Sequence, residues 1–152
     1  MICDETGKLS NWWTREDLAH FRQQSARLAE QYSQYKPFPD LAVNGKLTLS
    51  ENIADVAGLA IAYDAYRLSL GDRAAPSAQN LTGDQQFFLS FAQMWRAKIR
   101  EATLRRRVLT DGHSPPEYRA DTVRNLNPWY AAFSAQPGEK LYLGPSDRVS
   151  VW

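Results

Sequence analysis

The sequence has few thiols, few imidazoles and almost no net charge. Its 152 residues include one cysteine, Cys3, and two histidines, His20 and His113. A single thiol excludes an internal disulfide framework and a cysteine-rich zinc site, because both need several thiols from one chain. The chain has 18 Lys and Arg residues against 17 Asp and Glu residues, a net charge of +1. It therefore lacks the strong basic field of a dedicated nucleic-acid or acidic-membrane binder.

Long apolar runs are also missing. None approaches the roughly 18 residues of a transmembrane helix, and the first residues, Met1-Ile2-Cys3-Asp4-Glu5, are too short and too acidic for a secretion signal. We therefore expect no membrane partner, no membrane span and no export signal in this sequence. With 43% hydrophobic and 12% aromatic residues, the chain can bury a core, and we expect one domain over residues 1–152.

Helical periodicity dominates the apolar pattern, which predicts a mainly α fold. Four helices are predicted: from Thr14 to the stop at Pro37, from Thr48 or Ser50 to Gly71-Asp72, from Gln85 to about Arg107, and from Glu117 to Leu126. The second is apolar over most of its circumference, which is typical of a buried helix. The aromatic segment after residue 129 is expected to pack against the fold.

Two carboxylates stand close together at the start of the second predicted helix. Glu51 and Asp55 are four residues apart, so they share one face of the helix. Two such carboxylates repel and need a cation, which could be a metal ion, a protonated imidazole or a metal-bound imidazole. Alternatively, Thr48 and Glu51 have the spacing of a capping box. On spacing alone the cap is the commoner arrangement.

Four short stretches carry the most distinctive motifs. They are Leu49-Ser50-Glu51-Asn52-Ile53-Ala54-Asp55, Ser90-Phe91-Ala92-Gln93-Met94-Trp95, His113-Ser114-Pro115-Pro116-Glu117-Tyr118-Arg119 and Val151-Trp152. In this order they resemble successive signatures of the neprilysin-like zinc metallopeptidases, peptidase family M13. Asp4 to Thr14 is similar to the segment that follows the zinc-binding helix in that family. The resemblance covers nearly the whole chain and implies the C-terminal helical subdomain of a thermolysin-like (zincin) catalytic domain.

The resemblance implies a role for each residue of the candidate site. Glu51 would be the third zinc ligand, and Asp55 the carboxylate that orients a zinc-bound histidine. His113 would stabilise the oxyanion of the tetrahedral intermediate, and Arg119 would bind the substrate backbone. Met94 and Trp95 would form the wall of the pocket for the side chain that follows the scissile bond.

Each of these residues also has an ordinary interpretation when it is taken alone. A histidine between Gly112 and Ser114-Pro115-Pro116 is usually a solvated turn residue. Arg119 would be a surface arginine, and Met94 with Trp95 would be core, because Met and aromatic residues on helices mostly pack. His20 is expected at the surface.

The zinc-binding motif itself is missing from this sequence. A site of this kind needs a His-Glu-x-x-His helix, and neither histidine of the chain belongs to such a motif. In the family that helix lies just before the segment that Asp4 to Thr14 resembles. We therefore predict the C-terminal part of a metalloendopeptidase that acts on peptides with zinc as cofactor. By itself, the chain should neither hold zinc stably nor hydrolyse peptides.

A non-catalytic function is the alternative prediction. If the segments that complete the cleft are absent, apolar surface around Trp12, Trp13, Met94 and Trp95 would be exposed and could recruit a partner or a second copy of the chain. Nucleic-acid binding by the basic stretch from Arg96 to Arg107 has less support, because Glu101 interrupts it and the whole chain is near neutral. We therefore expect no nucleic-acid partner.

Overall fold

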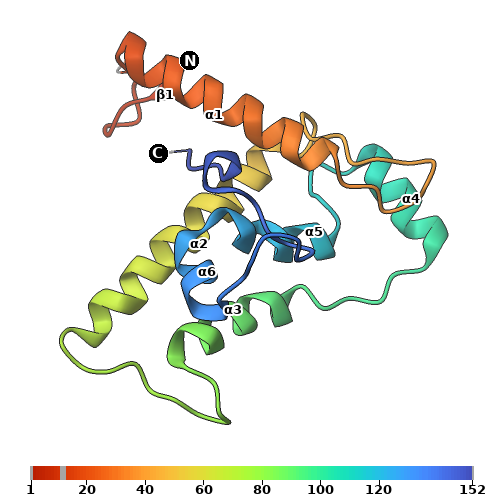
Figure 1. Ribbon diagram of the computed structural model, residues 1–152. Coiled ribbons are helices and arrows are strands. Elements are labelled where there is room, and N and C mark those ends of the chain that lie inside the picture. The colour runs from red at the N-terminus through yellow and green to blue at the C-terminus, as the bar shows by residue number, and fades with distance from the viewer. Residues whose placement is uncertain (1, 11–12, 152) are drawn as a thin grey trace.

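The computed structural model describes residues 2–10 and 13–151, so Trp12 and Trp152 of the predicted motifs lie outside the described residues. Figure 1 shows α1 crossing one end of the long helix α2, with α3, α5 and α6 in the middle of the molecule and α4 on the side away from α2. The elements are β1 (Ile2–Cys3), β2 (Leu9–Ser10), α1 (Arg15–Ser33), α2 (Leu49–Leu70), α3 (Gly83–Met94), α4 (Glu101–Thr110), α5 (Pro116–Ala120), the 3-10 helix η1 (Asp121–Asn125), α6 (Asn127–Phe133) and the 3-10 helix η2 (Pro145–Asp147). The predicted mainly α class is confirmed. None of the described helices is long and apolar enough to cross a membrane.

The first helix begins where the sequence predicts. The Thr14 hydroxyl accepts a hydrogen bond from the backbone N–H of Asp17 at 3.0 Å, which satisfies one of the free donors of the first turn. The helix ends at Ser33, before the predicted stop at Pro37. Its inner face buries Leu28 and Tyr32 completely.

Helix α2 joins two hydrophobic clusters. Val56 belongs to the first cluster and Leu59, one turn later, to the second. The first cluster draws its buried residues from α1, the loop before α2, α2, α5 and the C-terminal segment: Leu28, Tyr32, Val43, Val56, Tyr118, Val149 and Val151. The second draws them from α2, α3, η1 and the start of α6: Leu59, Phe88, Val123 and Leu126. One helix therefore fixes the two halves of the molecule relative to each other.

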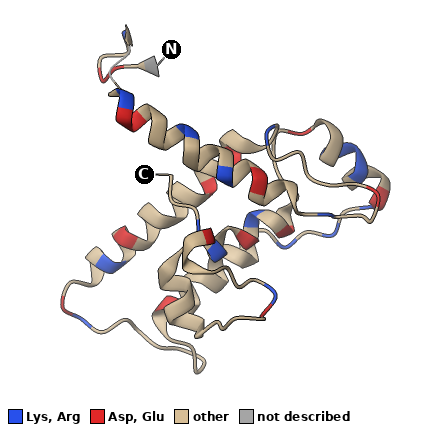
Figure 2. Ribbon diagram, turned by 45° about the horizontal axis from the view of Figure 1, so that its top comes forward, with Lys and Arg blue, Asp and Glu red and all other residues tan. Residues whose placement is uncertain are grey.

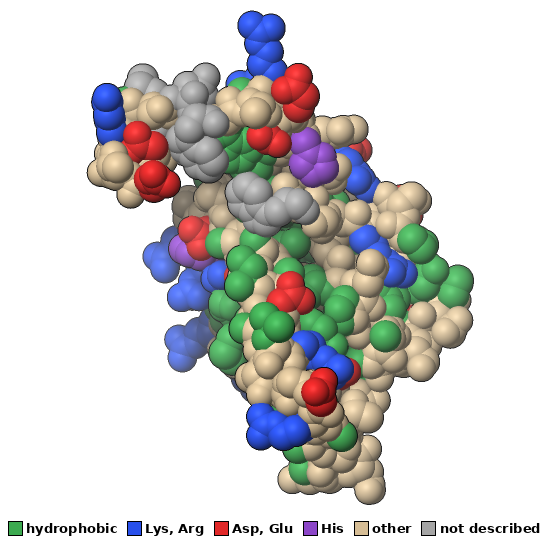
Figure 3. Space-filling model, turned by 90° about the vertical axis from the view of Figure 1, so that its left-hand side faces the viewer, with side chains coloured by type: hydrophobic (Ala, Val, Ile, Leu, Met, Phe, Trp, Pro, Cys, Tyr) green, Lys and Arg blue, Asp and Glu red, His purple; other side chains and the backbone are tan. Residues whose placement is uncertain are grey.

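The outer half of α2 is not buried, which corrects the expectation from its apolar composition. Ile61 is 65% exposed and Leu68 is 82% exposed. Figure 3 views the side of the molecule that carries α2 and shows hydrophobic side chains over the middle of that surface. Beyond Leu59, the rings of Tyr63 and Tyr66 pack against aromatic rings of α3, whereas the side of the helix that carries Ile61 and Leu68 is uncovered. Composition alone could not reveal this, because it does not show how many neighbours a helix has.

The prediction of one helix from Gln85 to about Arg107 is wrong. The structure has α3 and α4 in its place, with residues 95–100 in an irregular connection between them. The connection contains neither glycine nor proline, so no local signal marks the break. Trp95 ends α3 and stacks its ring 4.0 Å from the guanidinium carbon of Arg119. A contact with a distant residue therefore accompanies the break that local propensity does not show.

The C-terminal segment packs against the fold as expected. Val149 and Val151 are each only 2% exposed. Asn125 ties this segment to α1, because its side-chain oxygen accepts from the Val149 N–H at 2.9 Å and from the Gln31 amide at 3.0 Å. The short helix predicted from Glu117 to Leu126 is instead two elements, α5 and η1.

A carboxyl group in η1 gives a prediction about stability and pH. Burial, with the nearby negative charge of Glu117, raises the pKa of Asp121 from 3.8 to about 6. A raised folded-state pKa favours the protonated group, so its contribution to stability is lost as pH rises from about 4 to about 6. Asp121→Asn should therefore stabilise the fold by about 1–2 kcal/mol at pH 8, allowing for partial solvation, and by much less at pH 4.

Urea unfolding at the two pH values measures this difference. Asp64→Asn is the matched control, because Asp64 is exposed on α2 and should change stability little at either pH. Equal effects of Asp121→Asn at pH 4 and pH 8 would contradict the assignment.

Candidate active site

Four of the predicted site residues meet between α2 and the segment 113–119. Glu51 and Asp55 lie on one face of α2, one turn apart. His113 lies in the loop after α4, and Arg119 lies on the short helix α5. His113 pairs with Glu51, and Arg119 pairs with Asp55. Residues that are more than 60 positions apart in the sequence therefore form two neighbouring contacts.

The His113 ring lies between two carboxylates. Its Nδ1 is 2.8 Å from an oxygen of Asp111, and its Nε2 is 3.3 Å from Oε2 of Glu51. Asp111 also accepts the backbone N–H of His113 at 3.0 Å. These two hydrogen bonds, the side-chain bond first, hold the pKa of Asp111 below its ordinary value. Asp111 therefore orients the ring so that Nε2 is the nitrogen directed at Glu51.

Arg119 and Asp55 form a bidentate pair that is largely withdrawn from water. Nε and one terminal nitrogen of Arg119 each donate to a different oxygen of Asp55, both at 2.7 Å. The side chains are only 16% and 9% exposed. The indole of Trp95 covers the face of the guanidinium. The paired fork geometry and the stacked ring both restrict Arg119 to one orientation.

The capping-box alternative for Glu51 is not what the structure shows. Thr48 stands at the N-cap of α2 but makes no side-chain capping hydrogen bond. Its hydroxyl donates to the carbonyl of Asn44 and accepts from the amide of Asn52. Glu51 is directed at His113 instead. The ordinary interpretation of His113 as a solvated turn residue holds only in part, because the exposed ring has two carboxylate partners.

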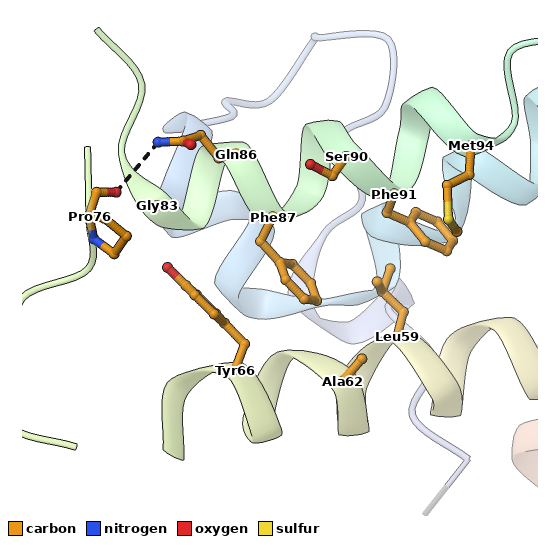
Figure 4. A pocket seen from close by; sticks show the side chains of 10 residues that line it. All are labelled: Leu59, Ala62, Tyr66, Pro76, Gly83, Gln86, Phe87, Ser90, Phe91 and Met94. Carbon is orange, nitrogen blue, oxygen red and sulfur yellow. Dashed lines mark hydrogen bonds between the residues drawn. The ribbon is translucent and has the colours of Figure 1, made fainter. Parts of the chain in front are cut away.

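Met94 is the last residue of α3 and directly precedes Trp95. It is 70% exposed and stands at one end of a hollow between α2 and α3. Figure 4 shows the apolar side chains of Leu59, Phe87 and Phe91 along this hollow, with the ring of Tyr66 toward the other end. The hollow has a volume of about 500 Å³, so α2 and α3 leave an apolar groove beside the site.

Two other groups of charged or titratable side chains stand out in the sequence, the isolated His20 and the basic residues of α4. His20 is exposed on α1, as expected. In Figure 2, basic residues of α4 have acidic neighbours, and Arg105 bonds both Asp40 and Glu101. This mixture of charges does not resemble a phosphate-binding surface.

The described residues supply one possible ligand of a metal site, but they do not supply a complete set of ligands. Glu51 offers a carboxylate that is 40% exposed, and carboxylate oxygen is an accepted zinc ligand. Within residues 2–10 and 13–151, no group of three or more His, Cys, Asp or Glu side chains is arranged to hold a metal ion. Any zinc bound at Glu51 therefore requires further donors.

Comparison with known proteins gives the family. The sequence profile described as Peptidase family M13 matches residues 1–149. The chain belongs to peptidase family M13. It is 36% identical to neprilysin-3 of Drosophila melanogaster over 98% of its length and 32% identical to a neutral endopeptidase of Lactobacillus helveticus over the same share. These matches cover 19% and 21% of the two relatives, so the chain spans about a fifth of their length.

Solved structures of the family share the fold. The open state of the zinc metalloprotease Zmp1 of Mycobacterium tuberculosis matches with a TM-score of 0.93 and 42% identity, over 98% of this chain and 24% of that one. PepO of Lactobacillus rhamnosis matches with a TM-score of 0.80 and 35% identity, over 97% and 22% of the two chains. This M13 chain therefore adopts the helical C-terminal architecture of the family's catalytic domain.

Sequence reasoning missed two buried polar residues of the site. Asn52 and Ser114 hydrogen-bond each other at 2.8 Å, and each adjoins a predicted site residue. Both belong to the motifs that carry the family resemblance, so their positions were visible. Their contact could not be predicted, because it joins segments 62 residues apart.

The site yields a prediction about its ion pair. Arg119→Lys removes the bidentate fork and should lower the free energy of unfolding by about 1–3 kcal/mol. Arg67→Lys is the matched control, because Arg67 pairs with Asp84 on the surface, with side chains 50% and 29% exposed. It should cost no more than about 0.5 kcal/mol. Urea unfolding of both variants measures the difference, and equal losses would contradict the special role of the Arg119 pair.

Proposed function

We propose that this chain forms the C-terminal part of the catalytic domain of a zinc metalloendopeptidase and supplies a metal ligand, an oxyanion donor and part of the substrate cleft. The observation that supports this most strongly is the approach of His113 to Glu51, at 3.3 Å between Nε2 and Oε2. A metal held by its ligand and a transition-state donor must both act on the same reacting carbonyl, so the ligand and the donor have to lie close together. Glu51 and His113 are far apart in the sequence but lie close enough together to meet this requirement.

Glu51 would be one of three protein ligands of the zinc. Because the described chain offers no complete donor set, we propose that the other two ligands are histidines of a His-Glu-x-x-His helix on polypeptide that precedes the segment resembling Asp4 to Thr14. When bound, zinc lowers the pKa of a bound water to about 7 and polarises the scissile carbonyl. Asp55 would orient one of the zinc-bound histidines, through lone pairs that Arg119 leaves free.

His113 would donate a hydrogen bond to the carbonyl oxygen of the scissile bond as negative charge develops there. The contact between Nδ1 and Asp111 supports this role, because it aims Nε2 toward Glu51 and therefore toward the metal. A donor fixed before the reaction needs no reorganisation when the charge appears. Such a donor typically contributes about 3 kcal/mol of transition-state stabilisation.

Arg119 would bind a carbonyl of the substrate backbone. Two of the five guanidinium N–H groups are used by Asp55, so donors remain for a peptide. Trp95 holds the plane of the guanidinium by stacking. Met94 and Trp95 would line the pocket for the side chain after the scissile bond, and the exposed side chain of Met94 agrees with a surface that contacts substrate.

The proposal can be tested by rebuilding a complete catalytic domain. A chimera would carry this chain in place of the matching fifth of the Lactobacillus helveticus neutral endopeptidase, which is 32% identical over 152 residues. We expect the chimera to hold about one zinc per chain and to hydrolyse peptides, whereas the 152-residue chain alone holds no stoichiometric zinc after dialysis. Glu51→Gln should lower the zinc content and abolish hydrolysis. His113→Ala should keep the zinc and slow hydrolysis by about 100- to 1,000-fold.

His20→Ala is the matched control for this experiment, because His20 is the other histidine of the chain and is exposed on α1. It should change neither zinc content nor hydrolysis. Circular dichroism confirms that each variant is folded. Two results would overturn the proposal: full zinc content in the folded Glu51→Gln chimera, or one tightly held zinc in the chain alone.

A second candidate function is self-association of this chain through its exposed apolar surface. Met94, Ile61 and Leu68 are each at least 65% exposed. Large side chains exposed along α2 and beside an apolar groove are typical of a surface that another protein covers. A second copy of the chain would bury this surface without any further component.

Sedimentation equilibrium tests this alternative. If it holds, the mass should rise above 17.3 kDa at about 0.1 mM protein, and Ile61→Gln with Leu68→Gln should restore the monomer. Ser50→Ala, an exposed change at the opposite end of α2, should leave the association intact. A compact monomer at every concentration would contradict self-association.

A further inference from the structure

A fully buried amide connects α2 to the loop that carries His113. Asn52 is 0% exposed, and its side-chain oxygen accepts a hydrogen bond from the Ser114 hydroxyl at 2.8 Å. Its side-chain nitrogen donates to the Thr48 hydroxyl at 2.9 Å, which in turn donates to the Asn44 carbonyl. Thr48 and Ser114 are 2% and 3% exposed. Four residues thus form a continuous series of hydrogen bonds from the loop before α2 to the His113 loop. Three of them, Thr48, Asn52 and Ser114, are buried, and Asn44 is exposed.

This series of hydrogen bonds lies next to the contact between Glu51 and His113. Asn52 follows Glu51 in the sequence, and Ser114 follows His113. The bond between Asn52 and Ser114 therefore fixes the backbones from which Glu51 and His113 project. Asp55 and Arg119 form a further polar contact between these two segments, one turn further along α2.

We propose that Asn52 and Ser114 are positioning residues that set the distance between Glu51 and His113. This inference rests on the proposed function for its catalytic meaning, but the geometry it concerns is a property of the chain itself. Glu51 and His113 must remain partly exposed to reach metal and substrate, and exposed ionic contacts are weak. A buried hydrogen bond holds its two segments more firmly, because separating them leaves a polar group without a partner.

The neutral character of the bond matters as well. An amide and two hydroxyls carry no charge, so salt and pH affect their hydrogen bonds much less than they affect an ionic contact. His113 can therefore exchange one polar partner for another while its backbone stays in place. In this proposal one set of groups holds the loop, and a different set contacts the substrate. Such a division is expected of a site whose geometry is fixed before binding.

The distance between the two side chains can be measured by NMR in the full 152-residue chain. Nuclear Overhauser effects between the His113 ring protons and the Glu51 side-chain protons report their proximity. Ser114→Ala removes the donor, and Asn52→Leu removes the acceptor while keeping a similar volume. We expect each variant to lower the intensity of this effect by about two-fold or more, while the fold is retained. Ser50→Ala, exposed beside Glu51, should leave the intensity unchanged.

The thermal midpoint of each variant separates positioning from general stability. A merely structural role would lower the midpoint and leave the Glu51–His113 effect intact in the folded protein, and that result would overturn the inference. If one variant fails to fold, the other still tests the bond from the opposite side. The measurement needs neither zinc nor substrate, so its outcome is independent of the test of the proposed peptidase function.

Discussion

The bidentate ion pair between Asp55 and Arg119 is the interaction on which the arrangement of the site depends. Both hydrogen bonds are 2.7 Å long, and both side chains are largely buried. A buried charge that loses its partner costs several kcal/mol, so the two helices that carry them are held together. Because Arg119 lies on α5, this pair places the preceding loop, with His113, over the first turn of α2. Trp95 stacks on the same guanidinium, which brings the end of α3 to the same point.

The site combines buried supports with exposed reactive groups. The ion pair and the bond between Asn52 and Ser114 are largely excluded from water, whereas Glu51 and His113 are 40% and 51% exposed. Helix α2 makes this possible, because Val56 and Leu59 anchor it in two hydrophobic clusters just beyond the site. The side chains proposed to contact metal and substrate therefore project from a backbone that cannot move easily. In the proposed function, such a site would orient a substrate without first reorganising itself.

The sequence predicts those features that depend on local signals or on the family motifs. The mainly α class, the start of α1 at Thr14 and the span of α2 follow from caps and periodicity, and the family follows from the motifs around Glu51 and His113. The break between α3 and α4 could not be predicted, because it coincides with the stacking of Trp95 on Arg119 and not with a local breaker. The sequence pattern wrongly predicts that the outer half of α2 is buried, because periodicity reports which residues are apolar and not what covers them. The bond between Asn52 and Ser114 lay inside recognised motifs, but only the fold shows that they touch.

A double-mutant cycle on Asp55 and Arg119 tests the central claim most directly. The free energies of unfolding of the 152-residue chain, Asp55→Ala, Arg119→Ala and the double variant give the coupling energy between the two side chains. The account predicts a coupling of about 2 kcal/mol or more, because both groups are buried and each is the other's partner. A coupling below about 0.5 kcal/mol, the value of an exposed surface pair, would contradict the claim that this pair holds the site together.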